Sequence, residues 1–577
     1  MKVEQNFKQT NIKQIQPKYI DNKGFTQKQN QYKNTNPNFT GGADLFLRFL
    51  DTNQAWGANA VDLFCMVLPR TLTDFSRGVD AGTETLRREG MGTANHSMVG
   101  AYGTLAGLAL ASGINGMYKL GENDIKANSI FTDAETMDMQ GAIWNNKLRD
   151  SLKNPDVNPI KEYLTETFKK YEALSPTENG KWIKIKDADI EKTVNILENE
   201  IKNNSPKMSK EGFANARTIL VSSLGAENNL RIIAEEGKPA HTSRYTVDSI
   251  IENTYKLGKV FTKEKVKEAF LAAENISENA FLKAMKSMNV KRSLLGIGIA
   301  SVAGVSAQPL NMYLTKKKTG RSDFVGGGAE DKSTGFKIKK SLVAALFGAG
   351  VLATIGKPKE LIKNLQFKGF TPTIKQFKFI YGVTIMSRFL SSRNDNELRE
   401  CTIKDTLGFA SWLILGNFVQ KLVAQSMDKS LIKKDGSGAM NWIKNSVLKS
   451  RDEVLHAALG DKVFKDGKAL SFNEMVNSLP KNSIARKQLK ILSIAQLAGY
   501  AYSALALGAG IPKLNIFITN KVMSAQKNKT QNISTTENNA TQNPAFNAQQ
   551  QVDNMLKPEN VAFLNNNQKH FTGTFGK

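Results

Sequence analysis

The chain has 577 residues, a net charge of +26, 40% hydrophobic residues and 23% charged residues. This balance excludes a protein made mostly of membrane spans, and it is compatible with globular domains that bury sizeable cores. Two distant cysteines, Cys65 and Cys401, exclude a disulfide framework, and four scattered histidines without neighbours at ligand spacing predict no metal site.

Both ends of the chain are rich in Asn and Gln and lack an apolar stripe. Residues 1–41 and 522–577 are therefore predicted to be disordered tails, because they bury too little apolar surface to offset the entropy of ordering. The first residues, MKVEQNFKQTNIKQIQPKYI, hold no apolar run of the kind a secretory signal needs, so no cleavable signal peptide is expected.

Residues 42–118 alternate apolar patches with charge, as in DLFLRFLDTNQAWGANAVDLFCMVLPRTL. Phe49, Phe64 and Leu68 can share helical faces, which predicts amphipathic helices that pack on a core or lie at a membrane interface. The region ends in a first apolar segment, 97–118, with the sequence SMVGAYGTLAGLALASGINGMY.

Residues 119–290 carry 26 basic and 26 acidic residues. Apolar residues recur there at three- and four-residue intervals, as in NPIKEYLTETFKKYEAL and DADIEKTVNILENEIKNN. The pattern predicts a neutral soluble helical domain, with one short strand at GKWIKIKD.

Residues 291–521 carry 36 basic and 15 acidic residues and hold the other apolar segments, 293–315, 341–356, 406–420 and 491–512. A spanning helix needs about 20 apolar residues. Segments 97–118, 293–315 and 491–512 meet that length, whereas 341–356 and 406–420 fit short, half-crossing or buried helices. Pro309 is expected to follow a helix that ends at Ala307.

Small residues recur at four-residue steps in these segments. One helix face without bulk lets two backbones approach closely, a packing mode typical of bilayers and also found in soluble cores. The predicted helix-packing residues are Gly103, Gly107, Gly296, Ala300, Gly304, Ala345, Ala349, Ala353, Gly499 and Ser503.

Basic residues next to apolar segments favour contact with anionic lipid head groups. The predicted head-group contacts are Lys316, Lys317, Lys318, Lys339 and Lys340. Lys and Arg are almost equally frequent on the two sides of each segment, so no conventional alternating topology is predicted. The segments contain no Asp, Glu, Lys, Arg or His, which argues against a proton-coupled transporter.

Motifs that carry chemistry are not found. Gly296-Ile-Gly298 lacks the third glycine and the acidic residue of a dinucleotide loop, and Asp331 precedes Lys332 in GGGAEDKST, where a phosphate loop needs glycine. No nucleophile elbow, metal motif or nucleic-acid module is present. No catalytic residue, cofactor or nucleic-acid partner is therefore predicted.

The sequence thus predicts an all-α protein with small-residue apolar helices, a soluble helical domain and disordered termini. The predicted function is that of a non-enzymatic membrane-associated protein, integral in a bacterial inner membrane, with a structural or interaction role and protein partners. Two alternatives remain: a soluble cytoplasmic interaction protein whose Gly/Ala helices form a core, and a channel or transporter. The sequence predicts no oligomeric state.

Overall fold

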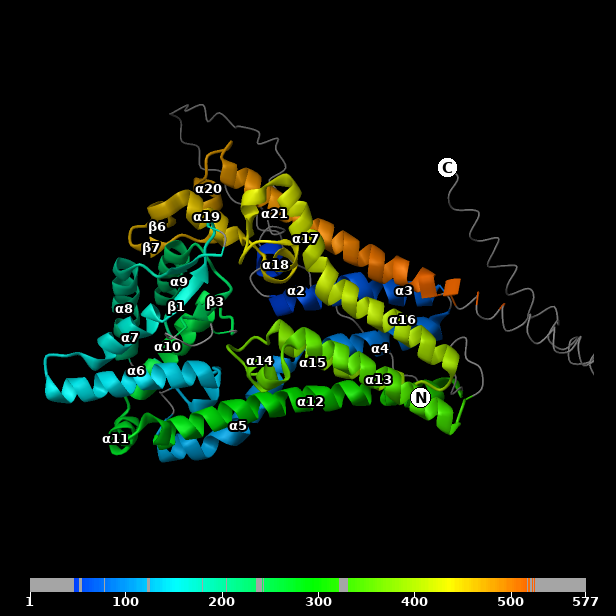
Figure 1. The fold of residues 1–577 in the computed structure, drawn as a ribbon, viewed down its shortest axis with the longest axis horizontal. Coiled ribbons are helices and arrows are strands. Elements are labelled where there is room, and N and C mark those ends of the chain that lie inside the picture. The colour runs from blue at the N-terminus through cyan, green and yellow to red at the C-terminus, as the bar shows by residue number, and fades with distance from the viewer. Residues whose placement is uncertain are drawn as a thin grey trace, which may run out of the picture.

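The computed structural model describes residues 46–50, 54–76, 78–121, 125–178, 180–203, 205–234, 241, 243–320 and 330–515, together with 517, 518, 521 and 524. The predicted tail 1–41, and all of 522–577 except residue 524, lie outside these ranges. The protein is all-α: long helices dominate, and the strands that the structure describes are two to four residues long. In Figure 1 a helical lobe lies at the left, and a bundle of longer helices extends from it to the right.

The left-hand lobe, the α6–α11 lobe, contains six helices around one apolar core, which also takes in the start of α12. The predicted strand at GKWIKIKD is present as β2, on the edge of an antiparallel sheet of order β2-β1-β3. The elements are α6 (Ala134–Lys153), α7 (Pro159–Lys169), β1 (Tyr171–Leu174), β2 (Trp182–Lys184), α8 (Asp187–Lys202), α9 (Lys210–Leu224), β3 (Leu230–Ile232), α10 (Val247–Phe261) and α11 (Glu264–Ala272).

Local signals fix several helix ends in this lobe. The Thr246 side chain accepts from the Ser249 amide while Ser249 accepts from the Thr246 amide, a capping box that begins α10. Gly225 ends α9 at φ +56°, a conformation that glycine adopts without the cost of a Cβ.

The bundle is built around α12, a single helix of 40 residues and therefore about 60 Å long. The bundle elements are α2 (Gln54–Val61), the π-helical turn η1 (Asp62–Val67), α3 (Leu68–Phe75), α4 (Val79–Ser97), α5 (Val99–Met117), α12 (Ala280–Thr319), α13 (Thr334–Ile355), α14 (Leu361–Asn364), α15 (Ile374–Leu390), α16 (Asp395–Ala410), α17 (Gly416–Met427) and α21 (Ile484–Ser503).

Helices α4 and α5 run antiparallel to α12 along most of its length. Lys318 pairs with Asp80 at one end, and Tyr118 packs edge-on against Phe281 at the other. The chain bends by 50° between α4 and α5. Because α12 begins in the core of the α6–α11 lobe and ends in the bundle, it joins the two as one continuous rod.

A small lobe packs on α9 through α19 and closes the top left of the molecule in Figure 1. It lies inside the region predicted as basic and helical, and it adds two short two-stranded antiparallel sheets. Its elements are β4 (Ile432–Lys433), α18 (Ala439–Asn445), β5 (Val447–Leu448), α19 (Arg451–Leu459), β6 (Phe464–Lys465), β7 (Lys468–Ala469) and α20 (Phe472–Ser478).

Two expectations about helix length are wrong. Segment 341–356 lies in a helix of 22 residues, and segment 406–420 lies in a continuous helical run, Asp395–Met427, because each helix extends into charged flanks. Pro309 does not end a helix: α12 continues through it to Thr319. Lost hydrogen bonding at one position does not stop a helix that neighbours hold along its length.

In the part of the chain that the structure describes, four helices are long and apolar enough to cross a membrane, and the bent α4–α5 pair is a fifth if it counts as one span. The four are Ala280–Lys318, Thr334–Ile355, Asp395–Met427 and Ile484–Asn515.

Candidate functional site

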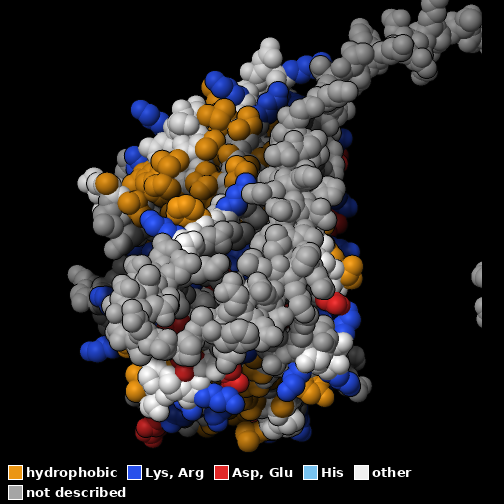
Figure 2. Space-filling model, turned by 90° about the vertical axis from the view of Figure 1, so that its right-hand side faces the viewer, with side chains coloured by type: hydrophobic (Ala, Val, Ile, Leu, Met, Phe, Trp, Pro, Cys, Tyr) orange, Lys and Arg blue, Asp and Glu red, His pale blue; other side chains and the backbone are white. Residues whose placement is uncertain are grey.

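The bundle exposes large apolar side chains on each of its long helices. In the most apolar window of α13 only 22% of the residues are buried. Figure 2 shows hydrophobic side chains gathered over one side of the bundle end, with Lys and Arg around them. A monomeric soluble protein rarely exposes apolar surface on this scale. Examples from four helices are Leu105, Leu108, Ile299, Val302, Leu342, Leu346, Leu497 and Leu505.

The predicted small-residue contact is closest where α5 crosses α12. A Cβ added to Gly296 would lie 3.0 Å from the Gly103 Cα and 3.0 Å from its nitrogen, so the two backbones touch. Gly107 is covered by the Arg292 side chain, and Gly304 by Thr384 of α15. Ala300, between these glycines on α12, is fully buried.

The second small-residue contact joins α17 and α21. A Cβ on Gly499 would meet Gln420 Cγ at 2.4 Å, and one on Gly416 would meet Ser503 Oγ at 3.2 Å. Gly499 and Ser503 therefore hold α21 close to α17.

On α13 the structure uses a different face from the one predicted. Ala345, Ala349 and Ala353 are exposed. The buried face is one position away, where Gly348 meets Met386 of α15. The segment SLVAALFGAGVLATIG holds small residues on both faces, so spacing does not identify the face that packs. The buried residues are Phe336, Ala344, Gly348, Val351 and Ile355.

The five predicted head-group lysines lie where α12 ends and α13 begins, at the right-hand end of the bundle in Figure 1. Within the chain, Lys318 pairs with Asp80 at 2.9 Å, Lys339 pairs with Asp395 at 2.9 Å, and Lys340 donates to the Ser392 carbonyl. Lys316 and Lys317 are exposed on the last turn of α12.

A buried ion network lies inside the bundle. The Glu89 carboxylate on α4 is 1% exposed and lies 3.2 to 3.4 Å from cations on three other elements and on its own helix. Arg388 also pairs with Asp405 at 3.2 Å. The sequence search missed this network because its members lie outside the uncharged segments. The cations around Glu89 are Arg70, Arg88, Arg388 and Lys404.

A buried His–Asp pair lies near the network. His96 is fully buried, its Nδ1 is 3.9 Å from an Asp62 oxygen, and the Thr93 hydroxyl donates to the same oxygen at 2.5 Å. Neither ring nitrogen of His96 has a hydrogen-bond partner among the described residues. Aromatic rings surround the imidazole: those of Phe377, Tyr381 and Trp412. His96 precedes segment 97–118 by one residue, which is why a search of the segments did not find it.

A second ion cluster joins the α6–α11 lobe to the small lobe. Arg217 of α9 contacts Glu227 and lies 2.8 Å from Asp248 and 2.9 Å from Asp452 of α19. Arg48 also donates two hydrogen bonds to the Asp452 carboxylate, of 2.7 and 2.6 Å. Burial by itself would raise the pKa of Asp452, but the effect of these two cations is larger and lowers the pKa to about 2. The cluster fastens the two lobes together.

His456 of α19 lies beside this cluster, and its Nδ1 is 2.7 Å from the Ser222 hydroxyl. The pKa of His456 is lowered to about 4, mainly by burial; Asp452 opposes this shift, and Arg217 and Arg48 contribute to it. An unfolded histidine binds its proton near pH 6.5, so between pH 6.5 and 4 the unfolded state holds one proton more. Protonation of His456 in the unfolded chain therefore lowers the free energy of unfolding as the pH falls from 6.5 to 4.

We expect His456→Gln to abolish that effect. The slope of unfolding free energy against pH should differ between wild type and variant by about 1.4 kcal/mol per pH unit between pH 6.5 and 4. Denaturant unfolding at half-unit pH steps measures it, and subtracting the two curves cancels the carboxylates common to both. Parallel curves would show that His456 ionises as freely in the folded protein as in the unfolded chain.

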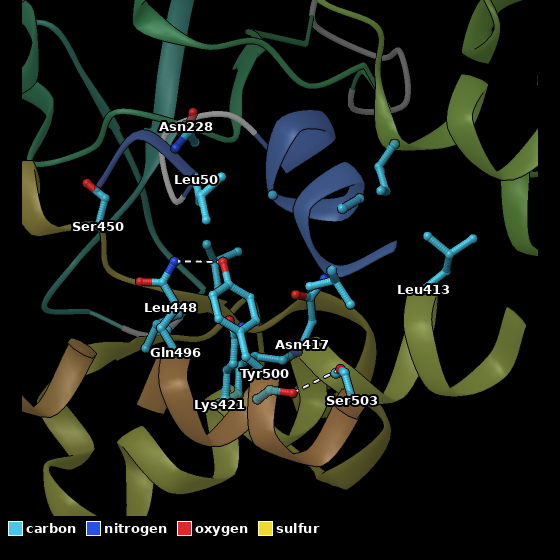
Figure 3. A pocket seen from close by; sticks show the side chains of 18 of the residues that line it. Leu50, Asn228, Leu413, Asn417, Lys421, Leu448, Ser450, Gln496, Tyr500 and Ser503 are labelled. Carbon is cyan, nitrogen blue, oxygen red and sulfur yellow. Dashed lines mark hydrogen bonds between the residues drawn. The ribbon is translucent and has the colours of Figure 1, made fainter. Parts of the chain in front are cut away.

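A cavity of about 320 Å³ lies where the bundle, the small lobe and a loop of the α6–α11 lobe meet. Figure 3 shows Asn228 and Leu50 on one side of it, and Asn417, Tyr500 and Ser503 on the other. Gln496 donates to the Tyr500 hydroxyl at 3.0 Å. Gly499 and Ser503, predicted for packing, also line the cavity.

Among the described residues, no three His, Cys, Asp or Glu side chains come together in a way that could hold a metal ion. Comparison of the chain with protein families, with curated proteins and with solved structures finds no match.

Proposed function

We propose that the protein is an integral membrane protein of the cell membrane, of the bacterial inner-membrane type, with a structural or interaction role. In this proposal the bundle lies in lipid, and the α6–α11 lobe and the small lobe lie in water, where they meet protein partners. The single observation that carries the proposal is the exposure of large apolar side chains along all four helices long enough to span.

The basic bundle end is the part proposed to meet anionic lipid. Lys316, Lys317, Lys318, Lys339 and Lys340 lie at one end of two neighbouring helices, and a lysine near an anionic surface contributes about 1 kcal/mol. Their internal partners Asp80 and Asp395 are themselves exposed, so these ion pairs stay accessible to head groups.

The proposal is tested by comparing two leucines that are equally exposed. Leu346 on α13 and Leu152 on α6 are each 65% exposed. Leu346→Lys places a charge in the proposed lipid region, which costs about 2.5–3.5 kcal/mol of insertion. Leu152→Lys places the same charge in water and should change nothing.

Alkaline carbonate extraction of membranes measures the outcome. Wild type and Leu152→Lys should stay in the pellet, and Leu346→Lys should shift toward the supernatant or fail to accumulate. Complete release of wild type into the supernatant would contradict integral insertion and favour the soluble interaction protein.

A channel or transporter is the second candidate, and the observation that favours it is the buried His96–Asp62 pair near the Glu89 network. Ionisable residues inside a membrane bundle are expensive and mark proton or ion pathways. We expect a pH gradient across reconstituted vesicles to decay faster with wild type than with His96→Gln. Equal decay for both would remove this candidate.

A further inference from the structure

Four side-chain amides from separate parts of the chain, besides that of Gln496, line the cavity. Asn228 and Asn229 come from the loop before β3, and Asn417 and Gln420 come from α17. Loop and helix lie on opposite sides of the hollow in Figure 3, where Asn228 and Asn417 are labelled. The fold therefore brings together carboxamides that are about 190 positions apart in the sequence.

None of these four side chains has a hydrogen bond to another residue in the part of the chain that the structure describes. This differs from the rest of the lining, where Gln496 is held by the Leu47 carbonyl and the Tyr500 hydroxyl, and Ser503 by the Gly499 carbonyl. A carboxamide offers two donor hydrogens and one acceptor oxygen, so the hollow presents donors and acceptors in pairs.

The two charged residues of the lining are both engaged. Lys421 donates to the Ile443 and Ser446 carbonyls at 3.3 Å. Glu453 accepts from Lys433 at 3.0 Å and from the Glu227 amide at 2.9 Å. The three N–H donors of Lys421 are used within the chain, and Glu453 is paired with Lys433, so an ionic ligand must break one of these interactions to gain a counter-ion, whereas a neutral ligand need not.

Apolar side chains lie among the amides in the lining and include Leu50, Leu413, Val447 and Leu448. The volume of about 320 Å³ lies at the lower end of the range for small-molecule sites, about 300–1,000 Å³. A suitable ligand is therefore small, with hydroxyls on opposite sides for the amides and C–H groups for the leucines.

Two of the four residues have a distinctive packing or backbone conformation. Gln420 lies against Gly499, where any Cβ would meet its Cγ at 2.4 Å, so glycine there leaves room for the amide. Asn229 holds a left-handed backbone with φ +64°, a strained conformation of the kind that clusters at binding sites.

We propose that this cavity binds a neutral polyhydroxyl small molecule of the carbohydrate class, whose hydroxyls are held by Asn228, Asn229, Asn417 and Gln420. The site goes beyond the proposed membrane role and does not depend on it, because the binding experiment uses detergent-solubilised full-length protein.

The probes are glucose, maltose, N-acetylglucosamine and glucose 6-phosphate, each titrated into the purified chain by calorimetry. We expect at least one neutral sugar to bind and glucose 6-phosphate to bind at least tenfold more weakly than glucose. Asn417→Leu and Gln420→Leu should each weaken binding at least tenfold. Gln425→Leu is the matched control, because it removes an amide from the same helix outside the cavity lining and should leave binding unchanged.

Asn228→Ala repeats the test on another element, and the thermal melting of every variant shows whether it is folded. Loss of binding in folded cavity variants, with binding kept in Gln425→Leu, supports the site. Absence of binding for all three neutral sugars, preference for the phosphate ester, or equal binding by folded cavity variants overturns it. Membrane extraction is a separate measurement, so a failure to bind sugar says nothing about insertion into the membrane.

Discussion

Replacement of Glu89 by Gln is expected to lower the free energy of unfolding by about 3–5 kcal/mol. The change keeps the shape of the side chain and removes one negative charge. In the wild type two carboxylates, Glu89 and Asp405, lie among four cations. In the variant Asp405 is the one carboxylate left in the network. Removing water from charges is expensive, and a buried ion that loses its partner keeps that cost without the compensating attraction.

The control is Glu178→Gln, in an ion pair with Lys181 whose two side chains are 60% and 59% exposed. Water screens that pair, so its loss should change stability by less than about 0.5 kcal/mol. Guanidinium unfolding in a mild detergent measures both variants. A loss below about 1 kcal/mol for Glu89→Gln would show that the network is hydrated and does not hold α4, α15 and α16 together.

Replacement of Gly296 by Ala is expected to cost about 1–3 kcal/mol, because a methyl group there meets backbone atoms of Gly103 at 3.0 Å. Backbone cannot rotate away as a side-chain end can, so α5 and α12 must separate or bend. The contact spans the two helices that connect the lobe and the bundle, and its loss should therefore affect unfolding of the whole chain.

Gly298→Ala is the matched control two residues further along α12, where an added Cβ has open space around it. Alanine favours a helix over glycine by about 1 kcal/mol, so this variant should be as stable as wild type or more stable. Opposite signs for the two variants in the same unfolding assay would verify close backbone packing. Equal effects would show that α5 and α12 do not approach each other as the structure has them.

Much of the helical content follows from local pattern. Three- and four-residue spacing predicted the helices α7 and α8, and the strand β2 was predicted at its place. Such features depend on neighbours within a few positions, through side-chain periodicity and caps. The helices at 341–356 and 406–420 are longer than predicted because the prediction took only uncharged residues. A helix continues past a charged residue as long as its backbone hydrogen bonds continue.

The candidate sites could not be predicted from the sequence to the same extent. Glu89 and Arg388 are 299 positions apart, and no motif around Lys404 indicates that its helix borders a buried network. The cavity unites residues from positions 50 to 503, none of which carries a motif by itself. Long-range packing, which a single sequence does not display, creates both features.

The sequence by itself determined an all-α chain with apolar helices rich in small residues, since period and composition are properties of each segment alone. The tertiary structure decided which small faces pack, selecting Gly103 with Gly296 and passing over Ala345, Ala349 and Ala353. It also decided where charges and amides converge. The physical reason is that burial, ion pairing and close backbone approach are set by the partner surface, which lies elsewhere in the chain.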